Sequence, residues 1–301
     1  MKDMTRGSDP GPVVVGIDGS RQARRAALWA ADEAVLRGVS LHLVHATDTD
    51  GREAFLSESD VVRISAGGRE LLDDTAAVVA ERRRGLPVTT ELSHSAPAVS
   101  LHAAVPGDGV LVVGHRGLGG FNALLLGSVG LKVAAGADTA VIVVRGDADA
   151  AAETNTVLVA VRDEHDLICA RHAARTAAAR KSTLRILHVW NVLQSVGNAA
   201  TMLDGMDEMA QGRMGSVTAV ADLIRDEFPE LTVHVDAESS MSVAAVLIEA
   251  SHHADLLVMG GRRSPGYIGA TLGHVTHTLV HHAHCPVELV PRLGLRHGSV
   301  S

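Results

Sequence analysis

The chain has 301 residues, of which 46% are hydrophobic but only 2% aromatic, and its formal net charge is −8. This length favours about two domains, and the scarcity of aromatic residues excludes stacking platforms for single-stranded nucleic acid. Because the charge is negative and no basic run is longer than residues 82–84, duplex nucleic acid is not expected as a partner either.

Nothing in the sequence predicts export or membrane insertion. Residues 1–12 contain no apolar segment typical of a signal peptide, and no run approaches 18 apolar residues. The two cysteines, Cys169 and Cys285, lie far apart in the sequence and do not indicate a disulfide framework. A reducing cytoplasm is therefore the expected location.

Aliphatic strands alternate with helices along the first half. The predicted strands cover residues 13–18, 41–46, 88–93, 109–113 and 141–144, and the predicted helices cover residues 22–37, 60–84, 96–104 and 128–136. This alternation predicts right-handed crossovers and a doubly wound parallel sheet. Ligands of such sheets bind beyond the carboxyl ends of the strands, where the strand order switches.

A glycine-spaced loop follows the fourth predicted strand. Its sequence, GHRGLGGFNALLLGS, has the spacing G-x2-G-x9-G-S, made by Gly114, Gly117, Gly127 and Ser128. Glycines allow a close approach to an anion and positive φ angles, and a helix N-terminus attracts negative charge. The loop therefore predicts a phosphate site, the alternative being a connection that binds nothing. It is neither a Walker A loop nor a dinucleotide fingerprint.

The second half repeats the first at an offset near 144 residues. Residues 13–18 match 157–162, residues 41–46 match 184–189, residues 109–117 match 254–263, and residues 139–145 match 285–291. A repeat of this size predicts two copies of one fold. The expected domains are residues 12–145 and 156–291, joined by a linker at 146–155, with a disordered N-terminus at 1–11 and a tail at 292–301.

The motifs VVVGIDGS, LHLVHA, VVGHRG, LLLGSV and HHAHCPVELV resemble the universal stress protein family over nearly the whole chain. The resemblance implies two tandem α/β domains, each a doubly wound five-stranded parallel sheet of strand order 3-2-1-4-5, as in adenine nucleotide alpha hydrolases. It also implies that the first domain binds ATP, with ADP or AMP as open alternatives and the need for Mg²⁺ undecided.

The resemblance also implies roles for individual residues. By position, Asp18 would hold the adenosine end, and Ala46 would meet adenine through its backbone. Val113 and Gly114 would line the ribose side. The expected phosphate contacts are Gly117, Gly127, Ser128 and Val129. The alternative role for Asp18 is to cap the next helix by accepting a hydrogen bond from the N–H of Gln22 or Ala23.

The second half departs from this pattern. Gly260 and Gly273 keep two of the glycines, but Arg263 and His274 replace the second glycine and the serine, and Arg162 stands where Asp18 stands. An arginine still suits phosphate contact, yet its Cβ blocks the close approach that glycine permits. A second site, with Val189 at the position of Ala46, is therefore expected to be weak, altered or empty.

The predicted role is a nucleotide-dependent stress-response or regulatory module. A slow ATPase or adenylyl-transfer enzyme, and a nucleotide-independent scaffold, remain alternatives. No catalytic residue and no metal site is predicted: His274, His277 and His281 share a helix face, but solvated or interfacial histidines are favoured over metal binding or pH sensing.

The last predicted strand of each half suggests how the halves associate. An intramolecular pseudo-dimer is expected through these strands, because sheet edges are normally covered, and a homodimer is left open. Glu288 in the last strand is expected to face solvent or the joint between the halves. No membrane partner is expected, and any protein partner is unknown.

Overall fold

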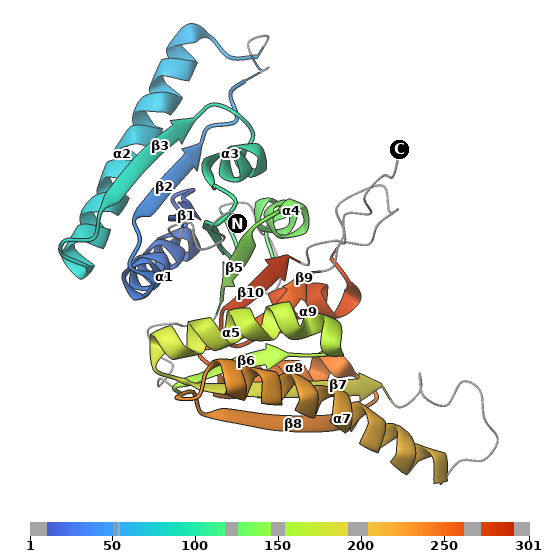
Figure 1. The fold of residues 1–301 in the computed structure, drawn as a ribbon. Coiled ribbons are helices and arrows are strands. Elements are labelled where there is room, and N and C mark those ends of the chain that lie inside the picture. The colour runs from blue at the N-terminus through green and yellow to red at the C-terminus, as the bar shows by residue number, and fades with distance from the viewer. Residues whose placement is uncertain are drawn as a thin grey trace, which may run out of the picture. The chain divides into compact units, whose positions relative to one another are not determined.

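The computed structural model describes residues 11–50, 52, 55–117, 126–145, 154–191, 204–261 and 272–291, with the backbone alone for 204–213. The chain divides into two compact units, Met1–Val144 and Arg145–Ser301. Both have the α/β fold with parallel strand pairs (Figure 1). None of the helices in these described ranges is long and apolar enough to cross a membrane.

The first unit alternates five strands with four helices. Its elements are β1 (Val13–Gly16), α1 (Arg21–Arg37), β2 (Leu41–Ala46), α2 (Glu58–Arg82), β3 (Val88–Ser93), α3 (Pro97–Ala104), β4 (Val110–Gly114), α4 (Ser128–Gly136) and β5 (Ala140–Val144). The strand order is β3-β2-β1-β4-β5, and each neighbouring pair is parallel. The predicted order 3-2-1-4-5 is confirmed, and it switches direction between β1 and β4.

Local sequence signals set the helix ends. The Ser20 hydroxyl accepts a hydrogen bond from the Ala23 N–H and caps α1, and Gly38 ends this helix with a φ of 68°. Ser57 and Asp60 form a capping box at the start of α2. These caps explain why both helices begin one or two residues earlier than the hydrophobic pattern predicts.

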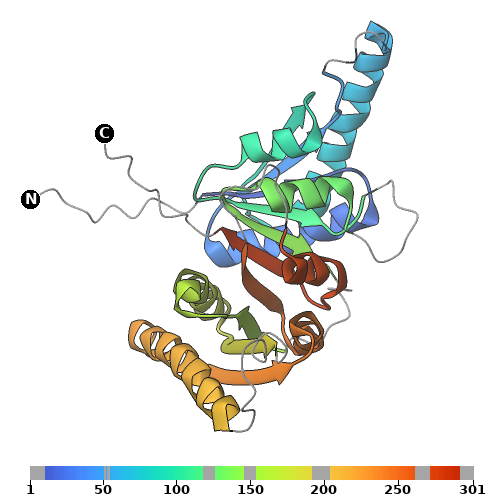
Figure 2. The ribbon, with the colours of Figure 1, turned by 90° about the vertical axis from the view of Figure 1, so that its right-hand side faces the viewer.

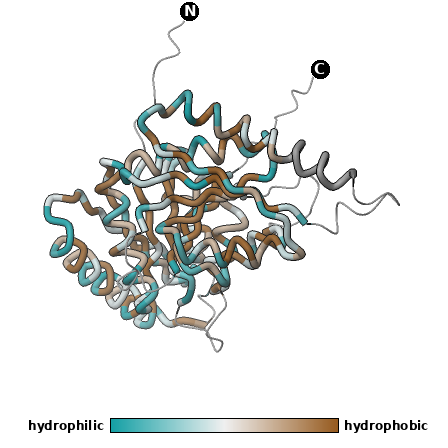
Figure 3. The backbone as a smooth tube through the Cα atoms, turned by 90° about the horizontal axis from the view of Figure 1, so that it is seen from below, coloured by the Kyte–Doolittle hydropathy of each residue, from teal (hydrophilic) through white to brown (hydrophobic). Residues whose placement is uncertain are grey.

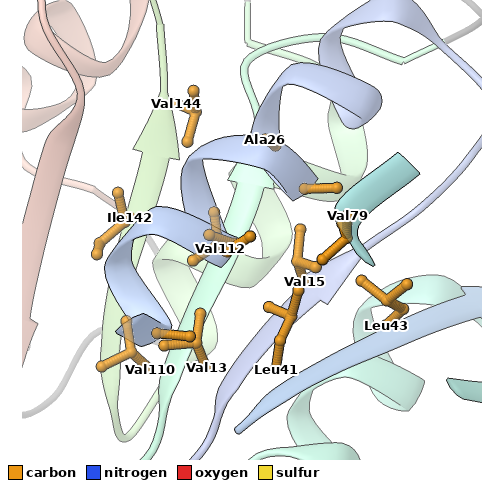
Figure 4. Packing of buried hydrophobic residues seen from close by; sticks show 14 of the residues in the cluster. Val13, Val15, Ala26, Leu41, Leu43, Val79, Val110, Val112, Ile142 and Val144 are labelled. Atoms are coloured by element: carbon orange, nitrogen blue, oxygen red, sulfur yellow. The ribbon is translucent and has the colours of Figure 1, made fainter. Parts of the chain in front are cut away.

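The core of the first unit lies between the sheet and the helix pair α1 and α2. Side chains from β1, β2, β4 and β5 point towards α1, with Val79 of α2 beside them (Figure 4). Alanines of α1 line this core, and they let the helix lie close to the strands. Helices α3 and α4 cover the opposite face of the sheet (Figure 1).

The second unit repeats this arrangement. Its elements are β6 (Thr156–Ala160), η1 (Glu164–Asp166), α5 (Leu167–Arg180), β7 (Thr183–Asn191), α7 (Asp204–Glu227), β8 (Val233–Ser240), α8 (Val243–Ala250), η2 (Ser251–His253), β9 (Leu256–Gly261), α9 (His274–His282) and β10 (Val287–Pro291). The strand order is β10-β9-β6-β7-β8, with parallel pairs throughout.

Two helices cover each face of the second sheet. Helices α5 and α7 lie on one side, and α8 and α9 lie on the other (Figure 2). The inner strands of both units are mostly hydrophobic, whereas hydrophilic residues lie on the outer turns of the helices (Figure 3). This burial on both faces explains the continuous aliphatic runs of the sequence.

The interior of the second unit contains one charged group that the sequence reading misplaced. Glu288 of β10 is fully buried, and its Oε1 lies 2.7 Å from Nε2 of His172 on α5. The expectation that Glu288 faces solvent is therefore wrong, and His172 of the same unit supplies a partner that a buried carboxylate needs.

Candidate functional site

The switch point of the first sheet brings several predicted residues together. Asp18 follows the end of β1, and Gly117 follows the end of β4. Parallel neighbours place these two ends at the same edge of the sheet. Helices α1 and α4 start at this edge, so their N-termini face the same region.

Asp18 and Gly117 lie directly against each other. The Asp18 Oδ1 atom accepts a hydrogen bond of 2.9 Å from the Ser20 N–H. A Cβ atom at Gly117 would lie only 2.2 Å from the Asp18 Oδ2 atom. Only glycine therefore fits position 117 while Asp18 keeps this orientation.

Ser20 ties the two ends together and performs the capping that was considered for Asp18. Its hydroxyl accepts from the Ala23 N–H at 3.1 Å and lies 3.5 Å from the Arg116 carbonyl oxygen. The alternative in which Asp18 itself caps α1 is thus wrong. Sequence reasoning missed Ser20, although a serine two residues after a strand-end aspartate is a recognisable N-cap signal.

Gly114 serves close packing, whereas a Cβ atom at Gly127 would make only ordinary contacts, the nearest at 3.6 Å from the Gly117 nitrogen. A Cβ atom at Gly114 would lie 2.9 Å from the carbonyl carbon and oxygen of Gln22, so Gly114 lets the first turn of α1 approach β4. The Gly127 N–H donates to the His115 carbonyl at 3.0 Å, and Gly127 has a φ of −62°. Gly19, at this edge of the sheet, has a positive φ of 83°. Gly114, Gly117 and Gly127 do not have positive φ angles.

The start of α4 offers backbone donors to an anion. Gly127 is the N-cap residue, and it provides no side-chain hydrogen bond to the first turn. Ser128 and Val129, the first two helical residues, are both exposed. Their N–H groups are among those that a helix leaves without intrahelical partners, so this terminus suits a phosphate. Residues 118–125 of the loop lie outside the described residues.

The remaining predicted residues differ in how much of them can reach a ligand. The Val113 side chain is 5% exposed, so only its backbone is available to line a ribose. Ala46 ends β2 opposite Ser93 of β3 and is half-buried. Beyond it, Thr47 and Thr49 hydrogen-bond each other and both approach the His94 ring, in a network that sequence reasoning did not predict.

The corresponding edge of the second unit has different chemistry. Asp166 accepts hydrogen bonds from both the backbone N–H and the Nε–H of Arg162, at 3.0 and 3.3 Å. Burial raises the pKa of the Asp166 carboxyl, which is 2% exposed. The guanidinium at the position that Asp18 holds in the first unit is therefore engaged by a carboxylate.

Part of the second glycine pattern is preserved. Gly273 caps α9 with φ −62° and ψ 156°, nearly the angles of Gly127, and His274 begins the helix with an exposed side chain. Gly260 lies near the end of β9, and Val189 in β7 is 8% exposed. Arg263 lies outside the described residues, so the loop around it is not compared.

Within the described part of the second unit, the cysteines and histidines do not assemble a reactive centre. Burial raises the pKa of the Cys169 thiol well above its ordinary value and that of Cys285 to about 12. The His277 and His281 rings lie 3.3 Å apart between their Nε2 atoms. Over the residues that the structure describes, no group of three or more histidine, cysteine or acidic side chains could hold a metal ion.

Comparison with known proteins agrees with the fold and the tandem repeat. The model of the universal stress protein family matches residues 11–145 and 153–291. A universal stress protein of Mycobacterium tuberculosis is 30% identical over 296 residues, covering 94% of this chain and 97% of its own length. Another from Mycolicibacterium smegmatis is 27% identical over 286 residues, covering 92% of this chain and 96% of its own.

The solved structures show the same fold. A universal stress protein from Archaeoglobus fulgidus aligns with a TM-score of 0.67 at 18% identity, over 94% of this chain and 96% of its own. Two family regions in tandem, with one fold repeated in two units, account for nearly the whole sequence. The chain therefore belongs to the universal stress protein family.

Proposed function

We propose that the first unit binds an adenine nucleotide, with ATP as the expected ligand, and that the chain is a nucleotide-dependent stress-response module. The observation that carries this proposal is the contact of Asp18 with Gly117 at the switch point. A carboxylate suited to sugar hydroxyls and a glycine suited to phosphate meet where such sheets bind ligands.

The residues present fit such a ligand. Asp18 keeps acceptor capacity beyond its bond to the Ser20 N–H, because a carboxylate has about four lone-pair sites. The exposed start of α4 supplies N–H groups and the positive end of the helix dipole. The Ala46 backbone at the end of β2 is proposed to meet the base, as the family resemblance implies. Together these groups cover the base, sugar and phosphate parts of a nucleotide.

The second unit is proposed to bind nucleotide more weakly. Where the first unit presents the Asp18 carboxylate, the second presents Arg162, whose guanidinium is bonded to Asp166. A ligand would have to compete with this buried carboxylate for the arginine. One strong site per chain is therefore the expected stoichiometry.

Binding without efficient turnover is the favoured activity. Phosphoryl transfer needs groups that hold a metal ion, a charge clamp and a positioned nucleophile. Asp18 is the acidic group that the structure places against the glycine loop, and its orientation is fixed by Ser20. A slow ATPase or adenylyl-transfer activity is the second candidate, and a nucleotide-independent scaffold is the third.

The nucleotide content of the purified protein separates these candidates. Mass spectrometry after denaturation is expected to find ATP, ADP or AMP, and calorimetry on nucleotide-free protein is expected to find one strong site. A protein that co-purifies with no nucleotide and gives no binding heat with any of the three would contradict the proposal and favour the scaffold. Rapid release of ADP would favour the enzyme.

A further inference from the structure

We infer that His45 is a positioning residue that frees the Ala46 N–H for a ligand, and that His188 does the same for Val189 in the second unit. The inference rests on the proposed nucleotide function in so far as the ligand is a nucleobase. It begins from a hydrogen bond between a histidine ring and the strand-end carbonyl. The His45 Nδ1 atom lies 2.7 Å from the carbonyl oxygen of Ile17, the residue before Asp18.

The repeat gives the same contact a second time. In the second unit, the His188 Nδ1 atom lies 2.8 Å from the Val161 carbonyl oxygen, and Val161 precedes Arg162. The two histidines occupy the same place in the LHLVHA and LRILHV motifs, just before Ala46 and Val189. The contact is thus kept although Asp18 and Arg162, the residues beyond it, differ completely.

The tautomer of these rings follows from their partners. A carbonyl oxygen only accepts, so each Nδ1 atom carries a proton and donates it. The His188 Nε2 atom is buried without a hydrogen-bond partner among the described residues. An unsatisfied N–H at Nε2 would be costly, so the tautomer that carries its proton on Nδ1 fits this environment.

The histidine occupies the carbonyl that the β-ladder would otherwise use. The Ile17 N–H donates to the Val44 carbonyl at 2.8 Å, which continues the ladder between β1 and β2. In a parallel ladder, the next bond would run from the Ala46 N–H to the Ile17 carbonyl. Within the described ranges no such bond is found, and none joins Val189 to Val161, although Val161 donates to Leu187 at 3.0 Å.

The consequence is a backbone donor at the end of β2. The Ile17 carbonyl is satisfied by the imidazole, so the Ala46 N–H is left for an acceptor beyond the sheet. Adenine and other purines carry ring nitrogens that accept such a bond. The same bond holds the Ile17 carbonyl next to Asp18. The His45 side chain therefore positions both the Ala46 N–H and Asp18 for the proposed ligand.

Gly68 of α2 leaves the space that the His45 ring occupies. A Cβ atom at Gly68 of α2 would lie 2.8 Å from the His45 Cδ2 atom and 2.6 Å from the Leu92 Cδ1 atom. A glycine inside a helix is unfavourable, so its presence here is explained by the space that the ring and Leu92 need. The neighbouring Gly67 has nothing within 4 Å of its would-be Cβ.

Amide hydrogen exchange and calorimetry with ATP test the inference on the full chain. In the wild type, the Ala46 amide should exchange faster than that of Val44, whose register partner in β1 is Gly16. In His45→Leu the Ala46 amide should slow, because it recovers the Ile17 carbonyl, and affinity for ATP should fall about fivefold, as expected for one lost hydrogen bond. His45→Asn should restore both values, since its amide nitrogen reaches the position of Nδ1.

The control is His42→Leu. His42 lies on the same strand but bonds to Thr89 and Glu91 of β3, so its loss should change neither value. Wild-type exchange at Ala46 as slow as at Val44 would overturn the inference, as would unchanged ATP affinity in a folded His45→Leu protein. If the wild type binds no nucleotide, the proposed function fails, and the exchange rates of Ala46 and Val189 still decide the role of the histidines.

Discussion

Alanine at position 117 is expected to weaken ligand binding at the proposed nucleotide site while the first unit stays folded. The added Cβ atom would lie 2.2 Å from the Asp18 Oδ2 atom, whereas real Cβ contacts are essentially never closer than 3.0 Å. The carboxylate is the free end of a short side chain, so it can rotate away. Rotation breaks its 2.9 Å bond from the Ser20 N–H and withdraws it from the ligand.

The size of the effect follows from the bonds lost. The intramolecular bond contributes about 1 kcal/mol to the free energy of unfolding, so a small drop in thermal stability is expected. Loss of the Asp18 contact to the ligand, at about 1.4 kcal/mol or more for a charged acceptor, weakens ATP binding about tenfold. Gly117→Asp should weaken it further, because a second carboxylate then lies beside Asp18 and the phosphates.

Calorimetry on nucleotide-free protein measures this change, with Gly107→Ala as the matched control. Gly107 belongs to the same unit, and its would-be Cβ meets nothing within 4 Å. Asp18→Ala tests the cause, since Gly117→Ala should cost no stability in that background. Equal ATP affinities in Gly117→Ala and Gly107→Ala would refute the assignment of this site.

Four further outcomes are expected. Gly67→Ala should raise the free energy of unfolding by about 0.5–1 kcal/mol, because Gly67 is an exposed helical site. Gly68→Ala should lower the free energy of unfolding and weaken ATP binding by displacing His45. Similar shifts in melting temperature for the two variants would contradict this. Burial, with His277, Arg145 and His282 nearby, lowers the pKa of His281 to about 4. The unfolded chain, with an ordinary histidine pKa near 6.5, then binds the extra proton, so stability should fall from pH 6.5 towards pH 4, and His281→Leu should flatten the profile measured by chemical denaturation. Titration with ATP should show one strong site per chain, and two equivalent sites would contradict the reading of Arg162. ATP should survive long incubation with the protein, and rapid magnesium-dependent ADP formation that requires Ser128 would contradict the expectation of slow turnover.

The strands and helices of the first unit could be predicted because burial on two faces leaves a simple pattern. Continuous aliphatic runs give the strands, and the internal repeat supports four of the five. The ends of the strands are harder to predict: the sequence pattern extends the first strand to Asp18, whereas it ends at Gly16. The His45 ring takes the carbonyl of Ile17 there, and a side chain that replaces a ladder bond leaves no mark in hydropathy.

The site could be predicted only in part. The glycine spacing and Asp18 pointed to one edge of the sheet, and the contact between Asp18 and Gly117 lies there. Ser20, His45 and the network around His94 were missed, because each acts through a partner far away in the sequence. Glu288 was misplaced for the same reason: its partner His172 is 116 residues away.

The buried pair of Glu288 and His172 makes the last strand of the second unit chemically different from that of the first, and this difference matters during folding. The register places Glu288 opposite Val258 and Ile142 opposite Val112, so Glu288 and Ile142 hold corresponding positions in the last strands. Tandem repeats are prone to exchange equivalent elements while they fold. A β10 strand that added to the first unit in place of β5 would bring a carboxylate into a core that has no His172, at a cost of several kcal/mol. One glutamate thus marks its strand as belonging to a single domain, and it discourages misassembly between otherwise similar halves.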